Sequence, residues 1–267
     1  MSGGAAGPEP GAPEPSAGHR WLVLRLEAPL LAFGGVAIDA VGVTRDFPAA
    51  SMLTGLFANA LGWTRTEAAA HQALQDRLVF GARRDRAGPP GPLTDSQNAR
   101  LEPRERGWTT WGRPEERGGG SLGIHRRQRD YHADACVRLV ARLEPAGDTA
   151  GGAPDLNALA AALERPARPL FIGRKPCLPS HPIWTPGADG TVTAPTVHAA
   201  LALLPPADDA DEPPWPALWP AGEGPESGAD VHRVTALADR RNWRTGLHGG
   251  TRRVVEGRVR PAMGTTP

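Results

Sequence analysis

The residues best suited to chemistry lie in one short run, where a glycine precedes two adjacent cations and a proline-broken loop. Gly173, Arg174 and Lys175 follow an apolar stub at residues 170–172, which predicts a strand that ends at this turn. Backbone N–H groups beside fixed positive charge at a sheet edge suit a phosphate group. The run therefore indicates nucleic-acid binding, with a solvated turn as the alternative interpretation.

Arginine is the main candidate for phosphate contact elsewhere in the chain. Of the 30 basic residues only Lys175 is a lysine, and arginine makes bidentate phosphate contacts. The further candidates flank predicted strands, a predicted helix or a basic C-terminal stretch, where an ordinary charged surface is the alternative. They are Arg25, Arg45, Arg126, Arg127, Arg129, Arg252 and Arg253.

Three uncharged side chains are also candidate RNA contacts. Ser51 stands at the start of a predicted helix, where its hydroxyl could either bond a phosphate or cap the helix. Trp108 and Trp111 lie in a stretch rich in glycine and arginine, where an indole could stack on a displaced base. A local aromatic cluster is the equal alternative for both tryptophans.

Charge is distributed unevenly along the 267 residues, although the net charge is only +1. Residues 81–142 hold 13 arginines and eight acidic residues, and residues 231–260 hold eight arginines and two acidic residues. Residues 205–230 hold seven acidic residues and no basic one. Local fields govern binding to a polyanion, so two basic stretches are compatible with a nucleic-acid partner.

Several classes of protein are disfavoured. Cys136 and Cys177 have no metal-ligand spacing, which predicts reduced thiols and no metal or other cofactor. Residues 1–18 are rich in Gly, Ala and Pro, and are expected to be a disordered tail rather than a signal peptide. No apolar run approaches the roughly 18 residues of a membrane span. We therefore expect a cytoplasmic protein with no membrane contact.

Hydrophobic periodicity predicts the elements of the first half of the chain. A strand is expected at 21–26, with Leu22, Leu24 and Leu26 on one face and Arg25 on the other. A long loop at 29–48 should follow. The remaining predictions are helices at 49–61, ended by Gly62, and 66–75, then a strand at 78–83.

The second half of the chain begins with an insertion at 87–123, in which 13 of 37 residues are Gly or Pro. Long stretches of this kind inside a domain are functional or disordered. Beyond it we expect one strand at 131–143, a helix capped by Asp155 and running to Glu164, and the strand at 170–172. Two more strands are predicted near 231–237 and 251–259.

This order fits an α+β, ferredoxin-like domain, which resembles the RNA-recognition motif, with an insertion and a smaller β-rich C-terminal region. We expect a tail at 1–18, the main domain at 19–184 with the insertion at about 84–128, a Pro-rich acidic linker at 185–230, and a basic β segment at 231–267.

Four stretches together resemble the CasD family (the Cas-five family), the crRNA 5′-handle-binding RAMP subunits of type I-E CRISPR Cascade. The similar family patterns are L-x-L-R-L-x-x-P, F-P-T-x-S-G-L-L-G-L-L, R-x-Y-L-x-D-A and P-L-Y-L-G-R-R. The stretches themselves lie at 21–35, 46–63, 129–140 and 169–184. Residues 94–100 (TDSQNAR) depart from an R-D-Y-H-T-like family segment, whereas GLHGG at 246–250 resembles a family glycine turn.

The resemblance implies a non-catalytic assembly subunit that binds and caps the crRNA 5′ handle. The same resemblance implies that the insertion at about 84–128 is a β-hairpin thumb that kinks the guide. It also implies contacts with the Cascade backbone subunit and with the large subunit that reads the PAM, with target DNA as a further candidate partner. Guide pairing would supply the sequence specificity.

Two alternatives stay open. Another branch of the family cleaves repeat RNA without metal, and Tyr131, Lys175, His125 and His132 provide residue types for such an endoribonuclease. The acidic stretch and Pro-rich tail would instead suit a protein-interaction module without direct RNA contact.

Overall fold

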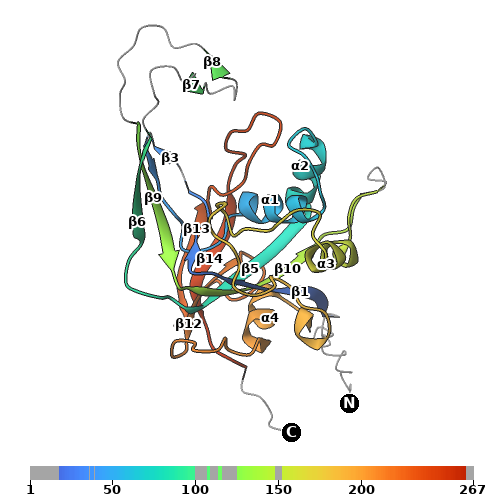
Figure 1. Cartoon of the computed structure of the whole chain (residues 1–267). Coiled ribbons are helices and arrows are strands. Elements are labelled where there is room, and N and C mark those ends of the chain that lie inside the picture. Colours follow the sequence, from blue (N-terminus) through green and yellow to red (C-terminus); the bar gives the residue numbers. More distant parts are fainter. Residues whose placement is uncertain are drawn as a thin grey trace, which may run out of the picture.

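A computed structural model gives the arrangement of the chain (Figure 1). The expected tail lies outside the described residues except for Gly18, and so do Trp111 and the side chain of Trp108. The residues described are 18–35, 37–38, 40–99, 107–108, 114–115, 125–147 and 152–262.

The centre of the fold is a seven-stranded sheet in which every pair of neighbouring strands is antiparallel. The strand order is β11-β1-β10-β5-β12-β14-β13. The strands are β1 (His19–Glu27), β5 (Leu78–Arg86), β10 (Cys136–Leu143), β11 (Thr191–Ala194), β12 (Trp215–Pro220), β13 (Val231–Leu237) and β14 (Arg252–Val259).

Helices cover both faces of this sheet. One face packs against α1 (Ala50–Ala60), α2 (Ala68–Arg77) and α3 (Leu156–Glu164), and the other against α4 (Val197–Leu203). In Figure 1, α1 and α2 lie above the sheet and α4 lies below it. Side chains of β1 alternate between the two faces of the sheet and so contribute to both cores. Leu22, Leu24 and Leu26 face the first set of helices, whereas Trp21 and Val23 face α4.

Helix α1 confirms the predicted helix at 49–61 and shows why it ends where it does. Leu53, Phe57 and Ala60 recur at helical spacing and are buried. Gly62 follows with φ +82°, the left-handed conformation that commonly ends a helix. The helices at 66–75 and 155–164 are also confirmed, as α2 and α3, and Asp155 caps α3 by accepting a hydrogen bond from Ala158 N at 2.7 Å.

A second sheet has the order β2-β9-β4-β3, and β6 pairs with β9 to make a hairpin. The hairpin lies at the left of Figure 1, away from the helices. The loop expected at 29–48 therefore contains three short strands. The bounds are β2 (Leu30–Leu31), β3 (Ala37–Ile38), β4 (Val41–Gly42), β6 (Leu93–Ala99) and β9 (His125–Ala133), with a separate pair β7 (Gly107–Trp108) and β8 (Pro114–Glu115).

The single strand expected at 131–143 is wrong, because the chain forms β9 and β10 with a break between them. Asp134 takes φ +50° at that break, and its N–H donates to Pro29 O at 3.0 Å. Tyr131 therefore belongs to the hairpin rather than to the central sheet. A continuous alternating pattern cannot reveal such a turn, since both strands keep the same period.

The strand expected at 170–172 is also wrong. Ile172 is fully buried, but its N–H donates to Cys177 O within its own loop at 2.7 Å. The strand beside β1 is β11, which follows a short 3₁₀ turn at Ala188–Gly190. Apolar residues at 170–172 thus report burial and not strand pairing.

The interpretation of 185–230 as a linker is corrected by the structure. This stretch contains β11, α4 and β12, and β12 joins β5 to β14 inside the seven-stranded sheet. Ala217 and Trp219 on β12 are buried in the core against α4. The acidic and proline-rich composition hid this short strand, because the acidic residues lie on either side of it. The predicted strands near 231–237 and 251–259 are confirmed as β13 and β14.

Candidate nucleic-acid interface

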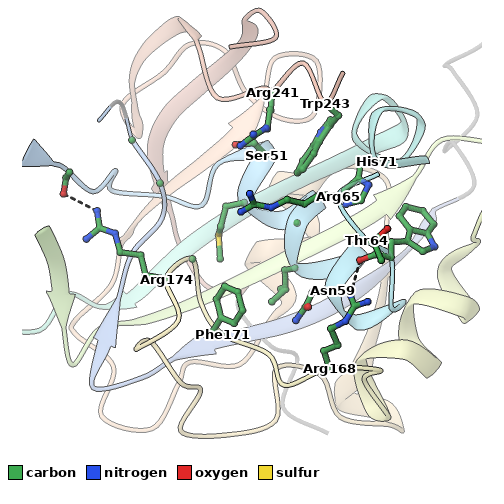
Figure 2. A pocket seen from close by; sticks show the side chains of 18 of the residues that line it. Ser51, Asn59, Thr64, Arg65, His71, Arg168, Phe171, Arg174, Arg241 and Trp243 are labelled. Carbon is green, nitrogen blue, oxygen red and sulfur yellow. Dashed lines mark hydrogen bonds between the residues drawn. The ribbon is translucent and has the colours of Figure 1, made fainter. Parts of the chain in front are cut away.

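A cavity of about 820 Å³ opens beside α1 (Figure 2). It lies between that helix, the loop at 171–174, β4 and the β13–β14 loop. Five arginines line it and no acidic side chain does, so its field attracts anions. The polar and aromatic residues that line it include Ser51, Asn59, Trp63, Thr64, Arg65, His71, Arg129, Arg168, Phe171, Arg174, Arg241 and Trp243.

One stripe of α1 makes the floor of the cavity. Ser51, Gly55 and Asn59 repeat every four residues, so they share the helix face opposite the buried Leu53 and Phe57. Gly55 leaves space above this floor, because glycine has no side chain. The result is a polar groove above a well-packed core.

Ser51 lines the cavity but does not cap the helix, which corrects one of its two interpretations. The N-cap position is Ala49, without a side-chain cap. Asp239, at the end of β13, instead takes the helix N–H groups, accepting from Ala50 N at 3.1 Å through its carboxylate and from Ser51 N at 3.0 Å through its carbonyl. A carboxylate at this position leaves less of the helix N-terminus for a phosphate.

Gly173 fixes the path of the loop that carries Arg174. Its φ is +85°, and a Cβ at this position would lie 1.6 Å from Ala32 O. No other residue fits such an approach. Glycine therefore holds this loop against the chain that follows β1.

Arg174 is bonded to the protein itself. Its Nη1 donates to Asp130 O at 2.8 Å, its Nη2 donates to Gly42 O at 2.8 Å, and its guanidinium lies 4.9 Å from the centre of the Tyr131 ring. These contacts join the loop to β4 and β9. The charge of Arg174 still contributes to the field of the cavity, but several of its donors are already used.

Two other cavity arginines are held in the same way. Arg168 donates to Trp63 O at 2.7 Å and to Gly62 O at 2.8 Å, in the turn just after the C-terminal end of α1. Arg129 donates to Gln128 O at 3.0 Å. These cations shape the cavity as much as they charge it.

Arg65 and Arg241 differ from the other three. Both are exposed, and within the described part of the chain neither side chain has a hydrogen bond or ion pair. Arg241 lies 5.3 Å from the centre of the Trp243 ring. Their donors are therefore available to a ligand. The sequence had instead singled out Arg174 for phosphate contact. Arg65 had no local signal, and Arg241 was visible only as part of a basic stretch.

Aromatic rings close one side of the cavity. The His71 ring centre lies 4.6 Å from that of Trp243 and 5.5 Å from that of Trp63. The buried amide of Gln75 holds this arrangement, donating to Arg241 O at 2.9 Å and accepting from Arg241 N at 3.0 Å and Trp243 Nε1 at 3.2 Å. The β13–β14 loop is therefore anchored on α2.

The other predicted site residues lie elsewhere. Arg25 faces the α4 side of the sheet and pairs with Glu27. Burial favours a higher pKa for Glu27, but hydrogen bonds from Arg86 and Arg25 hold this pKa below its usual value. Arg45 donates to Ala238 O at 2.7 Å, near the entry to the β13–β14 loop.

The C-terminal pair Arg252 and Arg253 is split between the two faces of β14. Arg252 pairs with the buried Asp239 at 2.9 Å and covers the Phe80 ring at 4.2 Å, so its role is structural. Arg253 is exposed and lies 3.5 Å from Glu226. Neither lines the cavity. The residues that the structure brings together there are Ser51, Arg129, Gly173 and Arg174, with Lys175 exposed beside them.

Arg126 and Arg127 are exposed on β9 of the hairpin, outside the cavity. On the same strand, Tyr131 is only 3% exposed beneath Arg174. His132 Nε2 lies 2.8 Å from Arg45 O, so it donates to that carbonyl. No Tyr or Lys lines the cavity among the described residues, and the His125 side chain lies outside them.

Both cysteines are buried and unpaired, as expected. Burial raises the pKa of Cys136 to about 12 and raises that of Cys177 as well. Neither thiol is therefore a nucleophile at neutral pH.

A basic cavity beside a hairpin-bearing antiparallel sheet is suited to a polyanion. The profile of the CRISPR-associated protein (Cas_Cas5) family matches residues 21–255, and the chain belongs to that family. It is 27% identical to the CRISPR system Cascade subunit CasD of Escherichia coli (strain K12) over 164 residues, which are 61% of this chain and 69% of the relative.

Two solved structures have a similar fold. One, a CRISPR RNA-guided surveillance complex, has a chain with a TM-score of 0.57 and 19% identity, and the match covers 90% of both chains. The other, described as the crystal structure of a Cas protein, has a TM-score of 0.55 and 25% identity, and the match covers 90% of this chain and 95% of that one. Separately, none of the helices in the described residues has the length and apolar character to cross a membrane.

Proposed function

We propose that this chain is the subunit of a type I-E Cascade surveillance complex that binds and caps the crRNA 5′ handle. The observation that carries the proposal is the cavity beside α1, which is lined by five arginines and by Trp, Phe and His rings but by no acidic residue. Arginine paired with aromatic surface suits single-stranded RNA. Membership of the Cas_Cas5 family and the similarity to a Cascade subunit, CasD, support a place in such a complex.

We also propose that part of the fold is a ferredoxin-like unit, which would support this role. Within the seven-stranded sheet, β1, β5, β10 and β11 come in this chain order, with helices between the first and second and between the third and fourth, and they lie in the order β11-β1-β10-β5. A β-α-β-β-α-β unit likewise has its fourth strand beside its first, which supports this proposal. The cavity lies at the edge of this unit, where its first helix meets the loops.

The hairpin of β6 and β9 is the proposed thumb. It projects from the sheet with Arg126 and Arg127 exposed, so it presents positive charge away from the core. We assign it the contact with the neighbouring backbone subunit and the guide. The large PAM-reading subunit and target DNA would meet other surfaces, in the cytoplasm.

The proposed role is binding without catalysis. Its support is that Tyr131 is buried and that His132 is committed to Arg45 O, which leaves the two residues without access to the cavity. Incubating repeat RNA with the purified chain in the presence of EDTA tests this role. Uncleaved RNA is expected, and cleavage at one fixed position would support the endoribonuclease alternative.

Sequencing of the RNA that co-purifies with the tagged chain, co-expressed with its genomic neighbours, tests the main proposal. Reads that share one fixed 5′ segment followed by variable spacer are expected. We call this shared part the 5′ segment. Random or absent RNA would contradict the proposal and favour a protein-interaction module.

A further inference from the structure

One lining residue of the cavity is a buried histidine that the proposed function leaves without a role. His71, on α2, is only 5% exposed and lies between the rings of Trp63 and Trp243. It nevertheless borders the cavity. In Figure 2, His71 and Thr64 lie on the side opposite Arg174, and the Arg65 side chain extends from their side toward the middle of the cavity. Packing against two indoles fixes the plane of the imidazole ring.

The hydrogen bond of His71 fixes which ring nitrogen carries the proton. Its Nδ1 lies 2.8 Å from Glu67 O, and the backbone N–H of His71 donates to the same carbonyl at 3.1 Å. A carbonyl oxygen can only accept, so Nδ1 is the protonated nitrogen. In the neutral ring Nε2 is then a bare acceptor. No hydrogen bond to Nε2 exists within the described residues.

This acceptor stands out in a cavity whose charged groups are all donors. The guanidinium groups of Arg65 and Arg241, which are free to bind, suit phosphate oxygens. A phosphate held there places its own ribose close by, and the 2′-hydroxyl is the donor that RNA has and DNA lacks. Thr64, which also lines the cavity, already bonds Glu67 and Thr66 through its hydroxyl.

We propose that Nε2 of His71 accepts a hydrogen bond from a ribose 2′-hydroxyl, so that this side of the cavity distinguishes RNA from DNA. The inference rests on the proposed function, since it needs RNA in the cavity. His71 is thus a specificity-determining residue, in contact with the ligand. A base amino group at the same point would be a different ligand donor, and the experiment separates the two.

The probes are the 5′ segment as an all-RNA oligonucleotide and a series with one 2′-deoxy position each. Wild-type chain should bind one member of the series roughly threefold to tenfold more weakly, the usual effect of one hydrogen bond. Two variants form a matched pair. The amide of His71→Asn replaces Nδ1 only, whereas that of His71→Gln reaches the position of Nε2.

His71→Asn should bind the all-RNA oligonucleotide as weakly as wild type binds the sensitive deoxy oligonucleotide, and it should bind the two oligonucleotides equally. His71→Gln should still bind the all-RNA oligonucleotide more tightly than the deoxy one. The inference is overturned if no deoxy position matters to wild type, or if His71→Asn keeps the discrimination. A further probe is the all-RNA oligonucleotide with one base replaced by an analogue that lacks the amino group. The inference is also overturned if this replacement, rather than a 2′-deoxy position, weakens binding to wild type and not to His71→Asn. Absence of any RNA binding by wild type would instead refute the proposed function.

A measurement on the wild-type chain keeps the test decisive if the variants do not fold. Long-range ¹H–¹⁵N spectra of the histidines report the tautomer of His71 directly. The all-RNA 5′ segment should shift the Nε2 resonance, and the sensitive deoxy oligonucleotide should shift it less. A proton on Nε2 in the free chain, or equal shifts with both oligonucleotides, would refute the inference.

Discussion

Replacing both Arg65 and Arg241 by alanine should weaken binding of the 5′ segment by roughly 10- to 100-fold. Each guanidinium is exposed at the cavity and has no hydrogen bond or ion pair in the described part of the chain. A hydrogen bond to a charged group contributes about 1.5–3 kcal/mol, and exposure favours the lower end of that range. Since about 1.4 kcal/mol is tenfold in affinity, two contacts give at most about 100-fold when they add fully.

The same substitutions should hardly change the free energy of unfolding. Arg241 is joined to Gln75 through its backbone, which alanine keeps, and its side chain contributes only the ring contact with Trp243. An exposed contact of this kind contributes roughly 0.5–1 kcal/mol. Thermal unfolding monitored by circular dichroism therefore separates a binding defect from a folding defect.

Fluorescence anisotropy over a series of salt concentrations is the assay. Each phosphate contact with single-stranded RNA contributes about 0.7 to the slope of log affinity against log salt, so the double variant should lose about 1.4. The matched control is Arg233→Ala with Arg260→Ala. Both side chains are exposed, on β13 and just after β14, outside the cavity, and each pairs with one acidic residue. An equal loss in the control, or an unchanged slope in the double variant, would refute the reasoning.

Three further predictions concern stability. Arg174→Ala should lower the free energy of unfolding by about 2–3 kcal/mol in urea denaturation because it removes the bonds that join its loop to β4 and β9, and an unchanged midpoint would contradict this. Gly173→Ala should be worse, since its Cβ would lie 1.6 Å from Ala32 O, and the measure is the yield of folded protein beside wild type. The pKa of Cys136, raised to about 12 by burial from 9.0, leaves the folded thiol protonated between these values, so stability should fall as pH rises above 9. In Cys136→Ser that loss should be smaller in melts at pH 8 and 10, with the part due to Cys177 remaining, and an equally steep loss would argue against Cys136 as a source.

Local sequence was enough for the elements whose signal is local. The apolar spacing of α1, the capping Asp155 and the glycine after α1 all lie within a few residues of the structure that they determine. The strand breaks were not predictable, because Asp134 turns the chain without interrupting the alternation. The acidic composition of 205–230 likewise hid β12, whose two tryptophans are buried by partners from other strands.

The site was predictable only in part. Gly173 and Arg174 were visible because a glycine and two cations in sequence suit phosphate, and the structure places both at the cavity. It also gives Arg174 carbonyl partners on β4 and β9, which no local pattern could indicate. Arg65 and Arg241 were not singled out, since each became significant only when the β13–β14 loop folded back onto α2.

By itself the sequence determined the family, the two basic stretches and the helices with a local signal, because those depend on residue type and order. The tertiary structure alone decided which cations are free. Arg25, Arg174 and Arg252 have the same side chain as Arg65, but each is close to an acidic group or carbonyl from elsewhere in the chain, which for Arg25 is Asp208. Whether an arginine stabilises the fold or binds a ligand depends on the acceptors within about 3 Å of its guanidinium.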